Sequence, residues 1–135
     1  MAERFEDLRV WQAARSLTQD VYTITNKGAF AKDFALKDQI RRAAISIMSN
    51  IAEGFESRTR PRFVDYLGIA KASAAEVRSQ LYVALDQGYL NQETFDTMTD
   101  NADKIGRQLY RLMNHLKAQH TTDRVRELPT EYLSR

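Results

Sequence analysis

The stretch RRAAISIMSNIAEGFESRTRPR, residues 41–62, decides the fold of this chain. Together with the residues just before it, its apolar spacing predicts a helix over Leu36–Phe55. The apolar residues of this helix form two stripes. Since successive residues are turned by about 100°, the second stripe lies roughly 160–200° around the helix from parts of the first. A helix that is apolar on two sides is expected to be buried on two sides. The first stripe comprises Leu36, Ile40, Ala44, Ile47 and Ile51, and the second comprises Ile45, Met48 and Ala52.

The end of the stretch predicts a break in the chain. Gly54 is expected to interrupt the helical pattern and to free the backbone that follows it. Because Pro61 restricts the residue before it, we expect the segment ESRTRPR, residues 56–62, to be extended or turning. Side chains at alternate positions of such a segment can splay together.

Three further helices are predicted from the same three- and four-residue spacing. The scarcity of breakers, with 5 Gly and 2 Pro, also favours long helices over many short strands. The expected helices run from about Glu6 to Thr25, from about Pro61 to a stop near Gly88, and from a cap at Asn91 to about Leu116.

Four helices joined by short connections predict an all-α fold, an antiparallel up-down-up-down four-helix bundle. We expect one bundle domain over residues 1–118. Residues 119–135 are polar and charged, and they predict a flexible C-terminal tail, with an ordered arm as the alternative.

The composition excludes several kinds of site. Cysteine is absent, which excludes a disulfide framework, a zinc knuckle and a thiol nucleophile. The first residues, MAERFEDLRVW, are charged where a signal peptide would be apolar. No apolar run approaches the roughly 20 residues that a membrane span needs. We therefore predict a cytoplasmic protein without membrane contact.

The histidines give little support to a metal centre or an active site. His115 and His120 are five residues apart, not the four that place two ligands on one helical face. Haem ligation by Met48 or Met98 together with His115 competes with the commoner role of methionine in a core. Some helical ribonucleases use an Arg and a His a short distance apart on the last helix. Arg111 and His115 lie four apart here, but an exposed polar face explains them more simply. We predict no metal, no cofactor and no enzymatic activity.

The basic residues are concentrated in one part of the chain. The net charge is only +2, yet residues 36–62 hold six Lys or Arg against three Asp or Glu. Arginine can bind phosphate through two parallel hydrogen bonds, and repetition over several copies of the chain would multiply such contacts. An ordinary solvated surface is the alternative. The candidate nucleic-acid-binding residues are Arg58, Arg60, Arg62, Lys37, Arg41 and Arg42.

The second apolar stripe of the helix over Leu36–Phe55 predicts self-association. A four-helix bundle buries about one broad stripe per helix, so the surplus side needs another surface, and a second copy of the chain is the simplest supplier. Small residues in this helix permit close approach. The predicted subunit interface comprises Ile45, Met48, Ser49 and Ala52.

Polar residues in and beside this helix have two interpretations. Ser46, Ser49, Asn50 and Glu53 could form a functional site, or they could be structural: satisfied groups that fix the helix register, or exposed residues at the helix end. We predict the second, a structural role for Asn50, Glu53 and Glu76, with Glu76 pairing with Arg41 or Arg42.

Residues 39–90, QIRRAAISIMSNIAEGFESRTRPRFVDYLGIAKASAAEVRSQLYVALDQGYL, resemble a known bacterial family. The chain is similar to the four-helix bundle proteins encoded in intervening sequences of large-subunit ribosomal RNA genes. That family includes the accessory variability determinant of diversity-generating retroelements. The likeness spans about residues 7–116. Its most specific part is Gln39, Arg41, Arg42, Ala43, Ser46, Ser49, Asn50, Ile51, Ala52, Glu53 and Gly54, followed by Phe63, Leu67, Ile69, Ala70, Ser73 and Glu76.

The resemblance implies a ring-shaped homopentamer with no established enzymatic activity. For the retroelement branch it also implies a reverse transcriptase as partner and nucleic-acid binding through a basic surface. We therefore predict a homo-oligomeric helical adaptor that binds RNA or DNA backbone and docks a reverse transcriptase. The alternative is a purely structural or protein-interaction module without a nucleic-acid role.

Overall fold

The structure is a computed structural model that describes residues 2–118 and 127–134. Within these two ranges the fold is all-helical and has no strand; an isolated β-bridge joins Leu8 to Leu133. The α-helices are α1 (Arg9–Thr25), α2 (Phe34–Glu56), α3 (Arg60–Asp86) and α4 (Gln92–Ala118), and the 3₁₀ helices are η1 (Phe5–Asp7), η2 (Gly28–Lys32) and η3 (Thr130–Tyr132).

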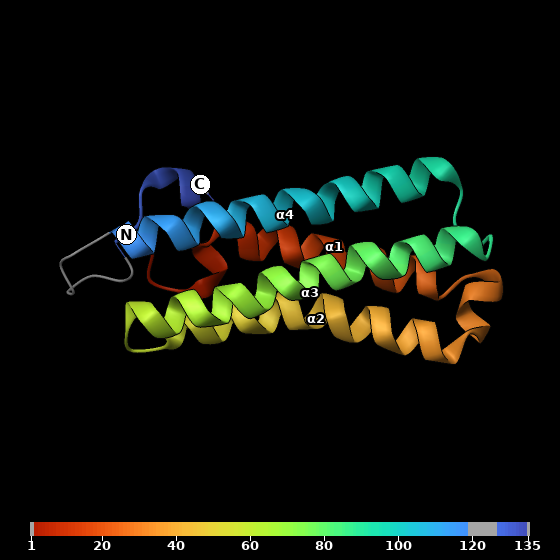
Figure 1. Ribbon diagram of the computed structural model, residues 1–135, viewed down its shortest axis with the longest axis horizontal. Helices are drawn as coiled ribbons and strands as arrows, with labels where there is room; N and C mark the ends of the chain where they lie inside the picture. Colours follow the sequence, from red (N-terminus) through yellow and green to blue (C-terminus); the bar gives the residue numbers. More distant parts are fainter. Residues whose placement is uncertain (1, 119–126, 135) are drawn as a thin grey trace.

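The four α-helices lie side by side along the long axis of the molecule (Figure 1). The connection between α2 and α3 lies at the end that also holds the N-terminus, and the other two connections lie at the opposite end. Helix α3 packs along both α2 and α4, whereas α1 makes less extensive contact with its neighbours. The extensive packing of the fold is therefore centred on α3.

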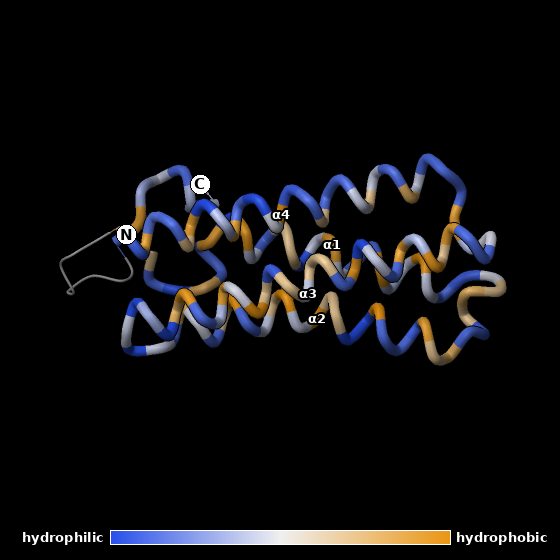
Figure 2. The backbone as a smooth tube through the Cα atoms, in the orientation of Figure 1, coloured by the Kyte–Doolittle hydropathy of each residue, from blue (hydrophilic) through white to orange (hydrophobic). Residues whose placement is uncertain are grey.

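The core consists of the predicted apolar stripes. Hydrophobic positions recur along each helix, as the colouring of Figure 2 shows. In α2 the first predicted stripe is buried throughout, which confirms the core assignment of that stripe. Full burial of one leucine or isoleucine contributes about 1.5–3 kcal/mol, so such stripes supply most of the stabilisation. The largest fully buried side chains are Phe30, Phe55, Phe63, Leu8, Leu17, Ile40, Ile47, Ile51, Leu67, Leu81, Ile105 and Leu109.

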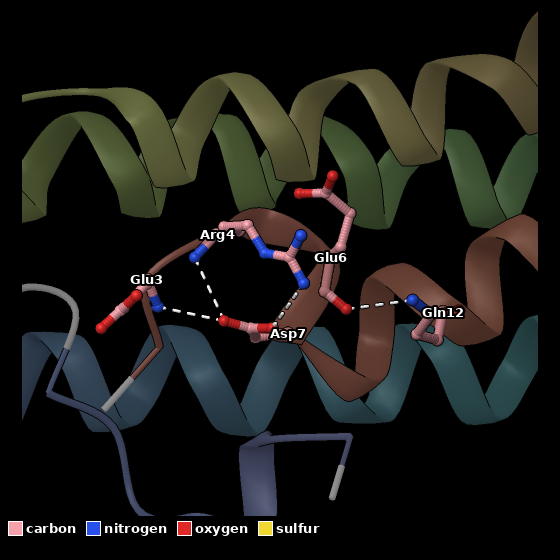
Figure 3. A network of polar contacts seen from close by, with 5 residues as sticks. All are labelled: Glu3, Arg4, Glu6, Asp7 and Gln12. Carbon is pink, nitrogen blue, oxygen red and sulfur yellow. Dashed lines mark hydrogen bonds and ion pairs between the residues drawn. The ribbon is translucent and has the colours of Figure 1, made fainter.

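The first helix begins later than predicted. The chain forms the short helix η1 before Leu8, and Leu8 itself has an extended backbone, so α1 begins at Arg9 rather than near Glu6. A network of polar contacts around the buried side chain of Asp7 holds the chain in place before α1 (Figure 3). The Asp7 carboxylate accepts hydrogen bonds from the backbone N–H groups of Glu3 (3.1 Å) and Arg4 (3.2 Å). Apolar periodicity alone does not reveal such a polar turn.

The end opposite the N-terminus is closed by contacts between two connections. Asp33 caps α2 by accepting a hydrogen bond from the backbone N–H of Leu36 (3.1 Å), and it also accepts one from the Tyr89 hydroxyl (2.8 Å). The bond to Asp33 raises the pKa of the Tyr89 phenol. The Tyr89 ring stacks on Phe30, with ring centroids 4.9 Å apart. At this end Gly88 has a φ of +78°, which supports its predicted role as the stop after α3.

The prediction for Gly54 is wrong. Helix α2 continues through this position to Glu56, and Gly54 is buried inside it. A Cβ placed on Gly54 would lie 2.8 Å from Tyr66 Cβ and 2.9 Å from Phe63 Cδ1, both on α3. The glycine is therefore needed for the close approach of two helices and not for a turn.

The predicted flexible tail is wrong for residues 127–134. Leu128 is buried, and the backbone N–H of Ser134 donates a hydrogen bond to the carbonyl oxygen of Asp7 (2.8 Å). The Tyr132 hydroxyl donates to the carbonyl oxygen of Arg111 (3.4 Å). This segment is thus an ordered arm that joins the two ends of the chain. Residues 119–126 and residue 135 of the predicted tail lie outside the described residues.

Candidate functional site

A polar contact fixes the register of α2 against α3. The Ser46 and Ser73 hydroxyl oxygens lie 2.9 Å apart, and Ser73 is buried. Asn50 Nδ2 donates to the Ser46 hydroxyl (3.0 Å) and to the Ser46 carbonyl oxygen (2.8 Å). Because a buried hydroxyl without a partner is costly, this network favours one alignment of the helices. Ser46 and Asn50 fit the interpretation as satisfied groups. Ser49 and Glu53 are exposed, and Glu53 lies in the last turn of α2, as the alternative of exposed helix-end residues expects.

Apolar side chains remain uncovered on the outer side of the same two helices. Ile45 on α2 is 41% exposed and Ile69 on α3 is 50% exposed. Their neighbours Ala44 and Ala70 face the core and are fully buried. Of the other residues predicted to form a subunit interface, Met48 and Ala52 are half-buried and Ser49 is exposed. The second apolar stripe of α2 is thus only partly covered within one chain, and its role as an interface stays a prediction.

The three arginines around Pro61 do not form one extended cluster. Arg58 lies in the short bend between the helices, whereas Arg60 and Arg62 belong to the first turn of α3. Two residues that are two apart on a helix point in directions about 200° apart, so the predicted splaying of alternate side chains is wrong here. Arg58 and Arg62 are exposed, whereas Arg60 is half-buried and its Nε atom has no hydrogen-bond partner among the described residues.

The remaining predicted cations lie near the opposite end of α2. A helix rises by about 1.5 Å per residue, so Arg41 lies on the order of 25 Å from Arg58 along the axis of α2. The Arg41 guanidinium is also occupied by α1, because it donates to Thr25 Oγ1 and Asn26 Oδ1 (both 2.8 Å) and stacks over the Tyr22 ring. The structure therefore divides the predicted basic surface into two groups.

Lys37 and Arg42 share this second end. Lys37 is half-buried, and its ammonium group lies 5.7 Å from the centre of the Phe34 ring. Arg42 is exposed.

The predicted ion pair of Glu76 is not formed. Among the described residues, no salt bridge joins Glu76 to Arg41 or Arg42, and Glu76 is exposed.

The sequence interpretation missed a polar groove between α3 and α4. Its hollow is about 240 Å³ in volume. Asp103 on α4 lies between two guanidinium groups, 3.1 Å from Arg107 Nε and 3.6 Å from Arg78 Nη1. The four-residue spacing of Asp103 and Arg107 is visible in the sequence, but the approach of Arg78 depends on how α3 aligns with α4. The lining residues are Lys71, Ala74, Ala75, Arg78, Asp103, Gly106, Arg107 and Tyr110.

Arg111 and His115 are part of the contact with the C-terminal arm. The His115 ring packs on Tyr132 with centroids 5.5 Å apart, and Arg111 accepts the Tyr132 hydrogen bond through its backbone. A hollow of about 150 Å³ lies nearby and is bordered by Arg9, Arg111 and Glu131, among others. Burial and the Glu131 carboxylate raise the pKa of the Tyr132 phenol, and the Arg111 charge opposes them. These contacts give both residues a packing role.

The described parts of the chain lack two features, a metal-binding group and a membrane-spanning helix. Within residues 2–118 and 127–134, no group of three or more His, Asp or Glu side chains is arranged to hold a metal ion. In the same ranges, no helix has the length and apolar character needed to cross a membrane.

Comparison with known proteins places the chain in a family. Residues 6–111 match the family described as 23S rRNA-intervening sequence protein. A crystal structure from Bacteroides thetaiotaomicron, a protein with unknown function from the S23 ribosomal protein family, has a similar fold, with a TM-score of 0.71. The two chains are 22% identical over 77% of this chain and 97% of the other. None of the curated proteins that were compared matches the chain. The family match covers most of the chain and includes α1, α2 and α3 in full, so the chain belongs to the 23S rRNA-intervening sequence protein family.

Proposed function

We propose that the chain is a non-enzymatic helical module that assembles with copies of itself and binds nucleic-acid backbone through repeated arginines. In this proposal α1–α4 run up-down-up-down, and the assembly is a ring of five copies, as the family resemblance implies. The protein acts in the cytoplasm, and a reverse transcriptase is its proposed protein partner. The observation that carries the proposal is the uncovered apolar surface of α2 and α3, together with the exposed arginines at the connection of those helices.

The support for assembly is the exposure of branched side chains on well-packed helices. Ile45, Ile69 and Val83 are all more than two-fifths exposed, although each belongs to a helix whose other side fills the core. Small residues beside them, Ser49 and Ala72, allow a second helix to approach closely. Burial of this surface against another copy would remove apolar area from water, which is the main driving force of association.

The support for nucleic-acid binding is the state of Arg58 and Arg62. Both are exposed, and neither makes an ion pair with another described residue. Their guanidinium groups are therefore available for phosphate. Carboxylates at Glu53, Glu56 and Asp65 reduce the local charge, so one copy would attract phosphate only weakly. Binding in this proposal consequently depends on many copies acting together.

A gel-shift series with RNA and DNA across salt concentration tests the binding. We expect the parent to bind both, with affinity that falls steeply as salt rises, because released counterions drive such binding. The Arg58→Ala/Arg62→Ala variant should bind at least about tenfold more weakly and show a shallower salt dependence. The control is Arg9→Ala/Arg15→Ala, which removes two exposed arginines from α1 and should bind nearly as the parent does.

Other results would favour other functions. A parent protein that shifts no nucleic acid at low salt would favour the purely structural or protein-interaction module. Cleavage of RNA by the parent that is lost in His115→Ala would contradict the non-enzymatic part of the proposal. Failure of a reverse transcriptase encoded beside the gene to co-purify with the protein would remove that partner.

A further inference from the structure

The groove between α3 and α4 is open because its floor consists of small residues. Ala74 and Ala75 of α3 and Gly106 of α4 line it, and a Cβ placed on Gly106 would meet no atom within 4 Å. The hollow is thus a shallow surface channel, and its contents would remain in contact with solvent.

The rim of the groove carries an excess of positive charge. Lys71, Arg78 and Arg107 provide three cations, and Asp103 provides one carboxylate. The Asp103 carboxylate lies 3.1 Å from Arg107 Nε on its own helix and 3.6 Å from Arg78 Nη1 on α3. One carboxylate cannot use all ten N–H donors of two guanidinium groups, so most donors remain for another acceptor. Asp103 therefore positions the two arginines and leaves the rim net positive.

A flat aromatic side chain stands beside these cations. Tyr110 lines the same hollow and is 55% exposed, so one face of its ring is accessible to a ligand. Exposed aromatic rings beside cations are suited to planar, negatively charged ligands, because the ring stacks and the cations bind the charge. Lys71 and Tyr110 lie on different helices, so the sequence alone does not bring them together.

We propose that this groove binds a short segment of single-stranded nucleic acid, with one base stacked on Tyr110 and adjacent phosphates on Arg78 and Arg107. This proposal rests on the proposed function in that the ligand is the same polymer, but it uses a different surface and adds contact with a base. The groove is too open to enclose a free nucleotide, whereas a strand can continue along α3 and α4 beyond the hollow.

Fluorescence anisotropy with labelled ten-residue oligonucleotides tests this site. The probes are oligo-U, oligo-dT and an oligonucleotide of equal charge that lacks bases. The parent should bind both base-containing strands more tightly than the strand without bases. Tyr110→Ala should weaken binding of the former about tenfold and leave the latter unchanged, because base stacking on an aromatic residue is lost. Tyr110→Phe retains the ring and should bind as the parent does.

The charged residues have a different signature. Arg78→Ala/Arg107→Ala should weaken the binding of all three probes alike and reduce the salt dependence of that binding, because phosphate contacts do not distinguish bases. The matched control is Lys104→Ala, which removes an exposed cation of α4 that pairs with Asp100 (3.0 Å) and borders a different hollow, toward α1. It should leave the affinities unchanged. Preference for oligo-U over oligo-dT would assign the strand as RNA, and equal affinity would assign it as either polymer.

The outcomes separate this proposal from the proposed function. If Tyr110→Ala binds every probe as the parent does, the groove proposal is overturned, and loss of binding in Arg58→Ala/Arg62→Ala would still support the arginine connection. If Tyr110→Ala weakens binding and Arg58→Ala/Arg62→Ala does not, the groove stands and the arginine connection fails. A parent that binds no probe overturns the groove proposal, and the gel-shift series still decides the arginine connection. Thermal melting of each variant, expected within a few degrees of the parent, excludes unfolding as the cause.

Discussion

Helix α3 has two long neighbours, and it meets them in opposite ways. Toward α2, Gly54 has no room for a methyl group, because Tyr66 and Phe63 of α3 fill the space beside it. Toward α4, Gly106 faces open space, and three cations and a tyrosine border the hollow. The same residue type thus serves close packing on one side and access on the other. The difference teaches that two similarly extensive helix contacts can leave no room for a methyl group on one side of α3 and a hollow open to solvent on the other.

The largest expected effect is that of Gly54→Ala. The added Cβ would lie 2.8 Å from Tyr66 Cβ, an atom next to the α3 backbone, so relief requires the helices to separate. Overpacking of this kind costs about 1–3 kcal/mol, and we expect a loss near the upper end of that range despite the better helix propensity of alanine. Urea unfolding measures the change. Parent-like stability of this variant would show that α2 and α3 are not in close contact there.

A smaller loss is expected from Ser46→Ala. The change leaves the buried hydroxyl of Ser73 without its recorded partner, and it should cost about 1–2 kcal/mol. In Ser46→Ala/Ser73→Ala no hydroxyl is left unpaired, so the double variant should be less destabilised than the sum of the two single variants by at least about 0.5 kcal/mol. Urea unfolding of the parent and the three variants provides the cycle. Additive effects would mean that the two hydroxyl groups do not interact.

Gly106→Ala should change the free energy of unfolding in the opposite direction. Its Cβ meets no atom within 4 Å, and alanine in a helix interior is favoured over glycine by roughly 0.5–1 kcal/mol. We therefore expect stabilisation of about that size in the same urea experiment that shows Gly54→Ala to be destabilised. If both glycine variants lose stability, α4 packs more closely on α3 than the groove geometry allows.

The smallest effect is expected from Asp103→Ala. Its ion pairs are about half-exposed at both ends, and pairs of this kind contribute less than about 1 kcal/mol. We expect a change below about 0.5 kcal/mol that shrinks further in high salt, as followed by thermal melting at two ionic strengths. A loss of several kcal/mol would indicate that the bridge holds α3 and α4 together rather than positioning two arginines.

The sequence predicts the helices and their core well because both follow from local spacing. It fails at Gly54 because a glycine near the expected end of a helix looks the same whether it stops the helix or admits a neighbour. At Gly88 the stop is real, and the positive φ shows it. At Gly54 the decisive fact is the position of Phe63 and Tyr66, which depends on the alignment of two helices. Local pattern does not contain that alignment.

The candidate site is less accessible to sequence reasoning for the same reason. Lys37, Arg41 and Arg58 are grouped in the sequence, but a straight helix places its two ends far apart. Conversely, Arg78 and Asp103 are separated by 25 positions and yet form an ion pair. For the C-terminal segment an ordered arm was only the alternative, because polar composition hides the few contacts that fix it, such as those of Leu128 and Tyr132.

The central claim is that assembly through α2 and α3 makes binding of nucleic acid strong enough to matter. One measurement tests it most directly: the RNA affinity of the parent and of Ile45→Gln/Ile69→Gln, each alongside its mass by light scattering. Glutamine adds no charge, so only the apolar surface changes. The account predicts a parent mass several times the 15.6 kDa of one chain, and a variant that has the mass of one chain and binds RNA at least about tenfold more weakly. A parent of 15.6 kDa, or a monomeric variant that binds RNA as tightly as the parent, would contradict it.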